Sequence, residues 1–246
     1  MRIQAAALVA VAMAALSACG RTTERDRDTT ASAAPAAPAA SAASAVPAAV
    51  PAVPAVVSAA VPAVVFLGTS LTAGYGLDED QAYPALIQQR IDSLGLPFRV
   101  VNAGVSGETS AGGLRRIDWL LRQPVAVLVL ELGANDGLRG QEVEAMRANL
   151  QAIIERTREA HPNVAIVVAG MESPPNMGRA YTSAFRAVFP GIARANEATL
   201  IPFLLEDVAA VPELNQTDGI HPTAEGQRIV AETVWRYLGP VLERGR

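Results

Sequence analysis

Three polar side chains have the types and spacing of a hydrolytic relay. Ser70 follows an apolar run that ends at Gly68, and a serine at such a strand-to-helix junction can project its hydroxyl above a sheet. A serine nucleophile needs a base, and the chain has only two histidines. His221 follows Asp218 by three residues, so a turn can bring the carboxylate to one imidazole nitrogen and leave the other for the serine. The spacing therefore indicates a nucleophile, a base and an orienting acid.

Each of these signals has an ordinary structural alternative when taken alone. Ser70 can be a helix N-cap, and Thr72 stands where the G-x-S-x-G elbow requires glycine. Asp218 and His221 also fit an Asp-Gly turn ahead of a helix-entry proline. The other histidine, His161, lies at the end of a long helical pattern, where a solvated histidine is common. Ser70 and His221 together favour the relay.

Two further loops contain donors suited to an oxyanion. Residues 102–109 include small residues that let backbone N–H groups approach a ligand. Residues 131–137 place the carboxamide of Asn135 beside glycines. An oxyanion hole combines such backbone and side-chain donors, while Gly and Asn are equally the ordinary residues of turns.

These segments resemble a known family. Four blocks of the SGNH (GDSL) hydrolases are similar to segments of this chain, in the family's order and spacing: Gly68-x-Ser70-Leu71, the Gly107 loop, Gly133-x-Asn135-Asp136 and Asp218-x-x-His221-Pro222. The similarity covers residues 63–240 and is strongest to the bacterial branch of periplasmic arylesterases and of the thioesterase I/lysophospholipase L1 type. It implies a flavodoxin-like α/β/α fold and hydrolysis of esters or thioesters through an acyl-enzyme, without cofactor or metal.

The resemblance implies a role for each matching residue. Ser70 is similar to the family's nucleophile, whose backbone N–H also joins the oxyanion hole. Gly107 resembles the second oxyanion donor through its N–H, and Asn135 resembles the third through its side chain. His221 resembles the general base and acid, and Asp218 resembles the residue that orients it.

One position departs from the family's pattern. The family has Asp in its Gly-Asp-Ser-Leu block, whereas this chain has Thr69, which can hydrogen-bond but carries no charge. Because the nucleophile, base and oxyanion donors are retained, we expect hydrolysis to persist, with the support of the nucleophile turn as the point affected. A catalytically silent, envelope-binding lipoprotein is the alternative that Thr69 and a long N-terminal tether leave open.

Short apolar runs alternate with longer helical patterns from Ala63 onward. Strands are expected at residues 64–67, 98–101, 125–130, 164–168 and around 200–201, and helices at residues 82–93, 110–121, 141–160, 181–195 and 224–238. Continuous apolar runs such as 125–130 suit strands buried on both faces of a parallel sheet. We therefore expect a three-layer α/β/α domain over residues 63–246, with a central parallel sheet of about five strands and the chemistry beyond their carboxyl ends.

The N-terminal segment has the features of an address and an anchor. Residues 5–16 form an apolar run behind Arg2 that is too short to span a bilayer and is typical of a signal peptide. The Leu-Ser-Ala-Cys sequence that ends at Cys19 resembles the lipobox of bacterial lipoproteins and predicts a signal peptide over residues 1–18 and a lipid on this single cysteine. A conventional signal peptide with an incidental cysteine is the alternative.

The segment after Cys19 predicts a tether and a location. Residues 31–62 contain only Ala, Pro, Val and Ser, so we expect a disordered tether over residues 19–62. Gly20 stands where an Asp would suggest retention in the inner membrane of a lipoprotein. The expected location is the periplasmic face of the outer membrane, with a soluble periplasmic or secreted protein as the alternative.

Composition narrows the partners. The formal net charge of −4 disfavours nucleic acid, and the complete absence of lysine excludes Schiff-base chemistry and a Walker-type phosphate loop. One cysteine and two histidines are too few for a Cys/His zinc site. Aromatic residues make up 4% of the chain, which makes a carbohydrate O-acetyl esterase a less favoured alternative. The expected partners are a small acyl-ester or lipid substrate and, through the anchor, a membrane.

The segment from Glu172 to Tyr181 bears on the substrate. It follows the fourth expected strand and, in the branch that the chain resembles, borders the acyl pocket. A proline-bearing connection between a strand and a helix is an equally good explanation of this segment.

Overall fold

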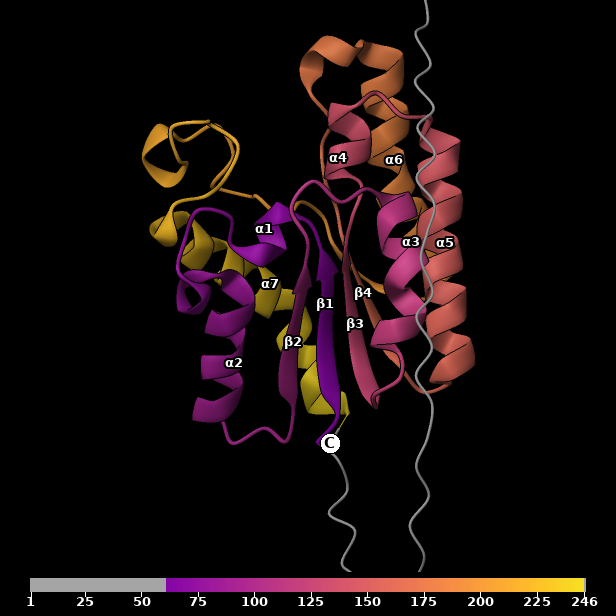
Figure 1. Ribbon diagram of the computed structural model, residues 1–246, viewed down its shortest axis with the longest axis vertical. Coiled ribbons are helices and arrows are strands. Elements are labelled where there is room, and N and C mark those ends of the chain that lie inside the picture. The colour runs from indigo at the N-terminus through magenta and orange to yellow at the C-terminus, as the bar shows by residue number, and fades with distance from the viewer. Residues whose placement is uncertain (1–60, 246) are drawn as a thin grey trace, which may run out of the picture. The chain divides into compact units, whose positions relative to one another are not determined.

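The computed structural model describes residues 61–245 (Figure 1). The predicted signal peptide, the predicted lipidation site Cys19 and nearly all of the predicted tether lie outside the described residues. Within residues 61–245, no helix combines the length and apolar character needed to cross a membrane.

The core of the domain is a parallel sheet of five strands. In chain order these are β1 (Ala63–Gly68), β2 (Arg99–Gly104), β3 (Val125–Glu131), β4 (Ala165–Ala169) and β5 (Thr199–Ile201). Their spatial order is β2-β1-β3-β4-β5, and every neighbouring pair is parallel. All of β1 and nearly all of β3 are buried, as the continuous apolar runs predict. The sheet confirms the predicted α/β fold class.

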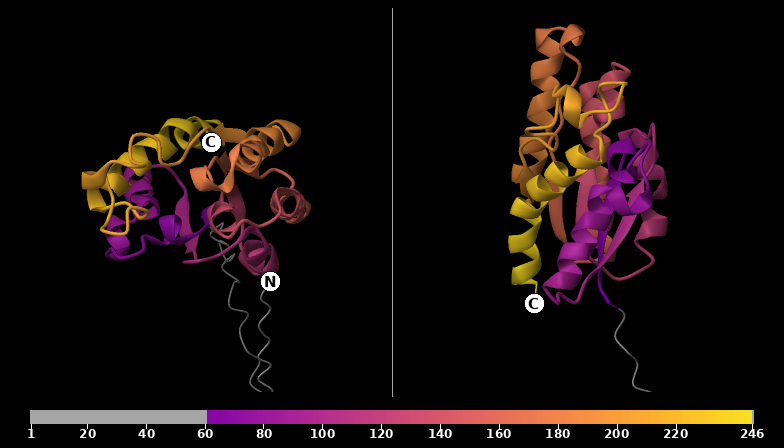
Figure 2. Two further views of the ribbon diagram at one scale, coloured as in Figure 1. Left: turned by 90° about the horizontal axis from the view of Figure 1, so that it is seen from above. Right: turned by 90° about the vertical axis from the view of Figure 1, so that its left-hand side faces the viewer.

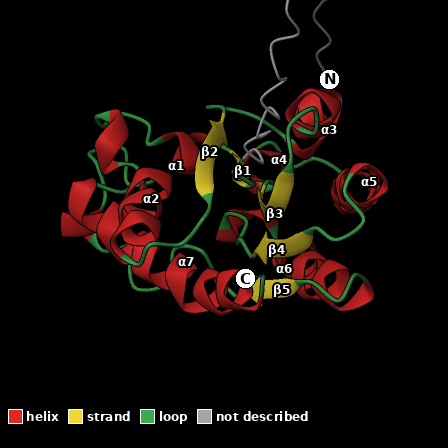
Figure 3. Cartoon of the chain, turned by 90° about the horizontal axis from the view of Figure 1, so that it is seen from below, coloured by secondary structure: helices red, strands yellow, loops and turns green. Residues whose placement is uncertain are grey.

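Helices cover both faces of this sheet. Two of them, α2 (Tyr83–Ser93) and α7 (Ala224–Arg244), pack against each other, and α3 (Ser110–Leu120), α5 (Val143–Ala160) and α6 (Arg179–Ala195) form a second layer (Figure 3). The chain moves outward from β1 to β2 and then back across to β3, and right-handed crossovers in opposite directions place their helices on opposite faces. The result is the predicted three-layer arrangement.

Local signals account for several helix boundaries. Thr109 and Thr223 cap α3 and α7, each accepting a backbone N–H three residues later at 3.3 Å. Pro84 lies in the first turn of α2, and Gly95 follows its C-cap with φ +63°. The last helix runs six residues past the predicted end at 238, through Pro240. Its neighbours Val241 and Leu242 are buried, and this burial offsets the backbone hydrogen bond that proline removes.

The sequence pattern did not predict two short helices. Helix α1 (Ser70–Ala73) follows β1, and α4 (Ala134–Leu138) follows β3. Three 3₁₀ segments were also not predicted: Glu79–Gln81, Pro175–Met177 and Pro212–Leu214. Such short elements contain too few residues to show a helical period.

The registers bring the ends of three strands level. Gly68 at the end of β1 pairs with Gly104 of β2 and with Glu131 of β3. The loops that follow these strands therefore meet at one edge of the sheet. The chain enters β1, and α7 ends, at the opposite end of the molecule (Figures 1 and 2).

Candidate active site

The structure brings the three predicted relay residues together. Ser70 begins α1 directly after β1, and its Oγ lies 2.9 Å from Nε2 of His221. The Nδ1 atom of the same imidazole lies 2.7 Å from Oδ2 of Asp218. Ser70 and His221 are 151 residues apart in the chain, so this contact exists only in the fold. Together the three side chains form one continuous hydrogen-bonded path.

Asp218 is held by its own turn. Its Oδ1 accepts the backbone N–H groups of Ile220 at 2.9 Å and of His221 at 3.0 Å. The hydrogen bond to the His221 side chain, with these two backbone bonds, lowers the pKa of Asp218 to about 2. The carboxylate therefore remains ionised across the neutral range and accepts a hydrogen bond from the imidazole Nδ1–H.

Tyr75 packs against His221, and sequence patterns gave no signal for it. Its ring centroid lies 4.5 Å from that of His221, with an angle of 38° between the planes. Gln216 connects the two segments, because its Nε2 donates to the Tyr75 carbonyl at 2.7 Å and its backbone N–H donates to the His221 carbonyl at 2.7 Å. These contacts hold the Tyr75 segment against the turn that carries His221.

The two predicted oxyanion loops border the same cavity as the relay. Gly107 adopts φ +77°, a left-handed conformation that favours glycine, and its carbonyl accepts Nη2 of Arg139 at 2.9 Å. Asn135 lies in α4, and its Nδ2 donates to the Glu108 carbonyl at 3.0 Å, which ties the two loops together. Both residues line the cavity with Ser70 and His221.

A buried carboxylate fixes these two loops to each other. Asp136 accepts the backbone N–H of Ser110 at 2.8 Å and its hydroxyl at 2.6 Å. Asn149 on α5 donates to the same hydroxyl at 3.0 Å. The start of α3 is thereby bound to α4, and Asn135 is placed by its immediate neighbour.

The cavity beside Ser70 has a volume of about 700 Å³. Its apolar lining includes Leu138, Met171, Pro174, Phe203, Leu205 and Ile220. Residues 172–175, part of the connection expected to border an acyl pocket, also line it. A cavity of this kind accepts an apolar chain or ring next to the reacting atoms.

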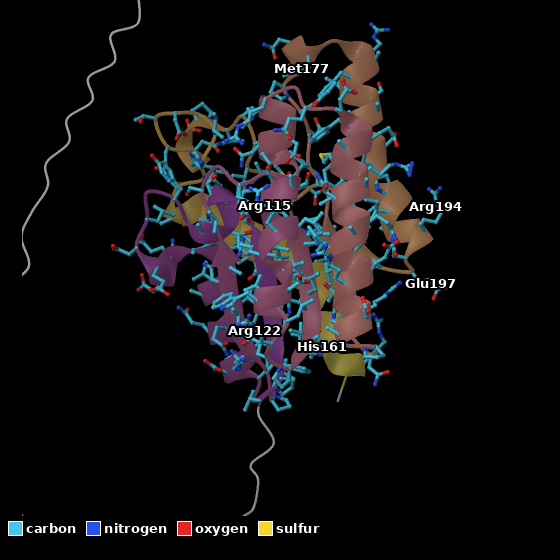
Figure 4. All side chains as sticks on the ribbon, turned by 45° about the vertical axis from the view of Figure 1, so that its right-hand side comes forward. Arg115, Arg122, His161, Met177, Arg194 and Glu197 are labelled. Atoms are coloured by element: carbon cyan, nitrogen blue, oxygen red, sulfur yellow. The ribbon has the colours of Figure 1, made fainter. Side chains whose placement is uncertain are left out.

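His161 takes no part in this site. It follows α5 at the amino-terminal end of the strands, where its Nε2 lies 3.0 Å from the carbonyl of Leu121. Figure 4 shows His161 and Met177, which lies in the segment after β4, at opposite ends of the domain. Among residues 61–245 no group of three or more His, Cys, Asp or Glu side chains is placed to hold a metal ion.

Thr69 supports the turn that carries Ser70 with a hydroxyl. It is the N-cap of α1, and its Oγ1 accepts the backbone N–H of Leu71 at 3.3 Å. The same hydroxyl donates to the carboxylate of Glu131, with Oγ1 at 3.0 Å from Oε2. The departure from the family's Asp therefore leaves the turn capped.

Comparison with known proteins agrees with this arrangement. Residues 66–229 match the model of the GDSL-like Lipase/Acylhydrolase family. The chain belongs to this family. It is accordingly an ester hydrolase, as the four sequence blocks predicted.

Each of three relatives matches about three quarters of the chain. Esterase TesA of Pseudomonas aeruginosa is 40% identical over 185 residues, which is 75% of this chain and 91% of the relative. Thioesterase 1/protease 1/lysophospholipase L1 of Escherichia coli is 38% identical over 75% of this chain and 87% of its own length. An arylesterase of Vibrio mimicus is 37% identical over 74% of this chain and 90% of its own length.

Solved structures show the same fold. The crystal structure of TesA superposes with a TM-score of 0.69 at 40% identity and covers 73% of this chain and 99% of that chain. The psychrotrophic esterase EstA from Pseudoalteromonas sp., in a structure inhibited by monoethylphosphonate, gives a TM-score of 0.69 at 34% identity. It covers 74% of this chain and 98% of that chain.

Proposed function

We propose that Ser70 is the nucleophile of a serine esterase, with His221 as its base and Asp218 as the residue that orients the base. His221 Nε2 removes the hydroxyl proton as Ser70 Oγ attacks the carbonyl carbon of the ester. The imidazolium then gives that proton to the leaving alcohol or thiol, which departs and leaves an acyl group on Ser70. Water, deprotonated by the same nitrogen, attacks the acyl-enzyme and releases the acid and the free serine.

The oxyanion of the tetrahedral intermediate needs hydrogen-bond donors that point at the former carbonyl oxygen. We assign this role to the backbone N–H groups of Ser70 and Gly107 and to the side-chain amide of Asn135, all three of which border the cavity. Asn135 donates one N–H to the Glu108 carbonyl, and its amide has a second N–H that can donate to the substrate.

One observation carries the proposal. The 2.9 Å contact between Ser70 Oγ and His221 Nε2 continues through the 2.7 Å contact to Asp218 and stands at the wall of an apolar cavity. Nucleophile and base within hydrogen-bond distance, with the base oriented by a third group, are the geometric requirement for this chemistry.

We propose acyl esters and thioesters, including aryl esters and lysophospholipids, as the substrate class. The cavity wall is mostly apolar, and relatives are named as an esterase, a thioesterase and lysophospholipase, and an arylesterase. An acetylated carbohydrate is the second candidate, because Tyr75 places an aromatic ring in the lining and deacetylation would use the same three residues. Comparing a p-nitrophenyl ester series of rising chain length with acyl-CoA and acetyl-xylan separates these classes, and we expect medium-chain esters to give a higher kcat/KM than acetyl-xylan.

Two observations weigh against a catalytically silent lipoprotein. His221 lies within hydrogen-bond distance of both Ser70 and Asp218. Thr69, the residue that motivated this alternative, still caps the helix that begins at Ser70.

Replacement of Ser70 tests the proposed function. We expect Ser70→Ala to reduce hydrolysis of p-nitrophenyl esters by at least about 10³-fold while far-UV circular dichroism stays unchanged. His161→Ala is the matched control, because His161 is the other histidine and lies at the far end of the domain, and it should keep the wild-type kcat. Comparable turnover in Ser70→Ala would remove the assignment.

We further propose that the chain is a lipoprotein of the bacterial envelope, anchored through Cys19 and facing the periplasm. The apolar run of residues 5–16 and the Leu-Ser-Ala-Cys sequence support this location. Wild-type protein should incorporate radiolabelled palmitate and fractionate with membranes, and Cys19→Ser should do neither. Equal fractionation of the two proteins without label would favour a conventional signal peptide and a soluble protein.

A further inference from the structure

A buried carboxylate lies beneath the nucleophile and has no part in the relay. Glu131 is the last residue of β3 and pairs with Gly68, two residues before Ser70. Its side chain is 0% exposed. A buried ionisable group persists in a fold only when its neighbours satisfy it, so its partners indicate what it holds.

All hydrogen-bond donors to this carboxylate flank Ser70. The backbone N–H of Thr69 donates to Oε2 at 2.8 Å, and the Thr69 hydroxyl lies 3.0 Å from the same oxygen and 3.1 Å from Oε1. The Thr72 hydroxyl donates to Oε2 at 2.8 Å. One carboxylate therefore binds the residue immediately before the nucleophile and a residue one half-turn after it.

The directions of these bonds are those of an ionised acceptor. The Thr69 N–H can only donate, and the Thr69 hydroxyl already accepts from the Leu71 N–H, which leaves its proton for Glu131. Thr72 Oγ1 lies 2.7 Å from the Tyr83 hydroxyl, which can donate to it while Thr72 donates to the carboxylate. Every donor and acceptor is satisfied when Glu131 carries the negative charge.

Gly68 leaves the space that the Glu131 carboxylate and the Thr72 hydroxyl occupy. A Cβ on Gly68 would lie 2.0 Å from Thr72 Oγ1 and 2.6 Å from Glu131 Oε2. The glycine of the nucleophile block is thus required so that the carboxylate can reach both threonines. Gln227 on α7 accepts the Tyr83 N–H at 2.8 Å and donates to the Leu71 carbonyl at 3.2 Å, so α7 is also bound to this turn.

We propose that Glu131 is a positioning residue of the nucleophile turn, which in its ionised form holds Ser70 in line with His221 through Thr69 and Thr72. The inference rests on the proposed function of Ser70. In this chain position 69 is neutral, and the carboxylate that supports the turn comes from the end of β3. The loss of this support misplaces the serine hydroxyl without removing any group that touches the substrate.

This role couples turnover to pH. Burial raises the pKa of Glu131 to about 7, against the opposing effect of its hydrogen bonds. The titratable side chain that faces it is Tyr83 of α2, whose pKa is raised by its own burial and by Glu131, so Tyr83 stays neutral. Thr69 and Thr72, its other neighbours, do not titrate. Protonation of Glu131 on the acid side should therefore lower turnover.

Glu131→Gln tests the inference. It keeps the shape of the side chain but sets an NH₂ group against one of the donors. We expect kcat to fall about 10- to 100-fold with KM changed less than about threefold, because a small misplacement of a reacting atom has this cost. The acid-side slope of log(kcat/KM) against pH should be lower by about 1 in Glu131→Gln than in the wild type, because one titrating carboxylate is removed. Glu144→Gln, on the exposed face of α5, is the matched control. Wild-type kcat and slope in folded Glu131→Gln would overturn the proposal.

Replacement of Thr69 covers the case in which Glu131→Gln does not fold. Thr69→Ser keeps the hydroxyl and should keep kcat within about threefold, whereas Thr69→Val, of similar shape, should lose about tenfold or more. Equal kcat in the two variants would contradict the role of Glu131. Ser70→Ala is measured in parallel: its inactivity beside a fully active Glu131→Gln discards only this inference, whereas an active Ser70→Ala discards the proposed function.

Discussion

The His221 imidazole has both nitrogens engaged, and this fixes its tautomer. Asp218 is ionised because hydrogen bonds from His221 and Ile220 lower its pKa to about 2, so it can only accept. Nδ1 therefore carries the proton, and Nε2 is left to accept from the Ser70 hydroxyl at 2.9 Å. In the proposed mechanism, Asp218 also stabilises the imidazolium that forms when Ser70 attacks.

Asp218→Asn should separate orientation from charge. The amide can occupy the same turn but no longer fixes the proton on Nδ1, and we expect kcat to fall on the order of 10²- to 10⁴-fold. Asp118→Asn, which removes a carboxylate from an exposed pair with Arg156, is the control and should change kcat by less than twofold. Steady-state hydrolysis of a p-nitrophenyl ester measures both variants. A wild-type kcat in Asp218→Asn would show that His221 needs no carboxylate.

Scarcity made some of the site residues predictable. Two histidines limited the choice of base, and a serine at a strand end and an Asp three residues before His221 completed the prediction. Tyr75 and Glu131 were missed because one aromatic residue after a loop, or one carboxylate after an apolar run, has no distinctive spacing. The sign of Glu131 in the sequence is a charged residue at the end of a strand that is otherwise apolar. Only the register of β1 and β3 shows what it contacts.

The strand ends and the short helices build the site. β1 delivers Ser70 to α1, β3 delivers Asn135 to α4, and the turn before α7 delivers His221. The strands and long helices could be predicted because their apolar residues repeat over many positions. The short helices α1 and α4 could not, since four or five residues contain little more than one turn, and a turn of this length depends on tertiary contacts.

Gly68→Ala tests the packing of β1 against the carboxylate network. Its new Cβ would overlap Thr72 Oγ1 and Glu131 Oε2, both of which are buried, so we expect a loss of about 1–3 kcal/mol in the free energy of unfolding and a lower kcat. Gly191→Ala is the matched control: no atom lies within 4 Å of its Cβ, and alanine inside α6 should stabilise by up to about 1 kcal/mol. Urea denaturation distinguishes the two. Equal stability of Gly68→Ala and wild type would contradict the tight packing described for this turn.

The folded domain buries the carboxylate of Glu131, which has no cationic partner in the contacts described for it. Three hydroxyl and backbone donors hold Glu131, and burial raises its pKa from 4.5 to about 7. The folded state then binds this proton more tightly than the unfolded state. Protonation of Glu131 therefore contributes to the free energy of unfolding. This contribution is complete below the unfolded pKa and is lost as pH rises through the folded pKa.

The raised pKa of Glu131 in the folded state predicts how stability depends on pH. Between pH 5 and pH 8 the free energy of unfolding of the wild type should fall relative to that of Glu131→Gln, by up to about 3 kcal/mol. A chain beginning at Gly20, unfolded in urea at a series of pH values, provides the measurement. Parallel curves for the two proteins would show that Glu131 titrates alike in the folded and unfolded states.

The identity of the nucleophile is the central claim, and covalent labelling tests it most directly. A fluorophosphonate should react with the wild-type protein, and peptide mass spectrometry should place the adduct on Ser70. The reaction should be absent in Ser70→Ala and slowed by about 10³-fold or more in His221→Ala, because the hydroxyl then has no base. An adduct on another residue, or a lack of adduct in a protein that hydrolyses esters, would contradict the account.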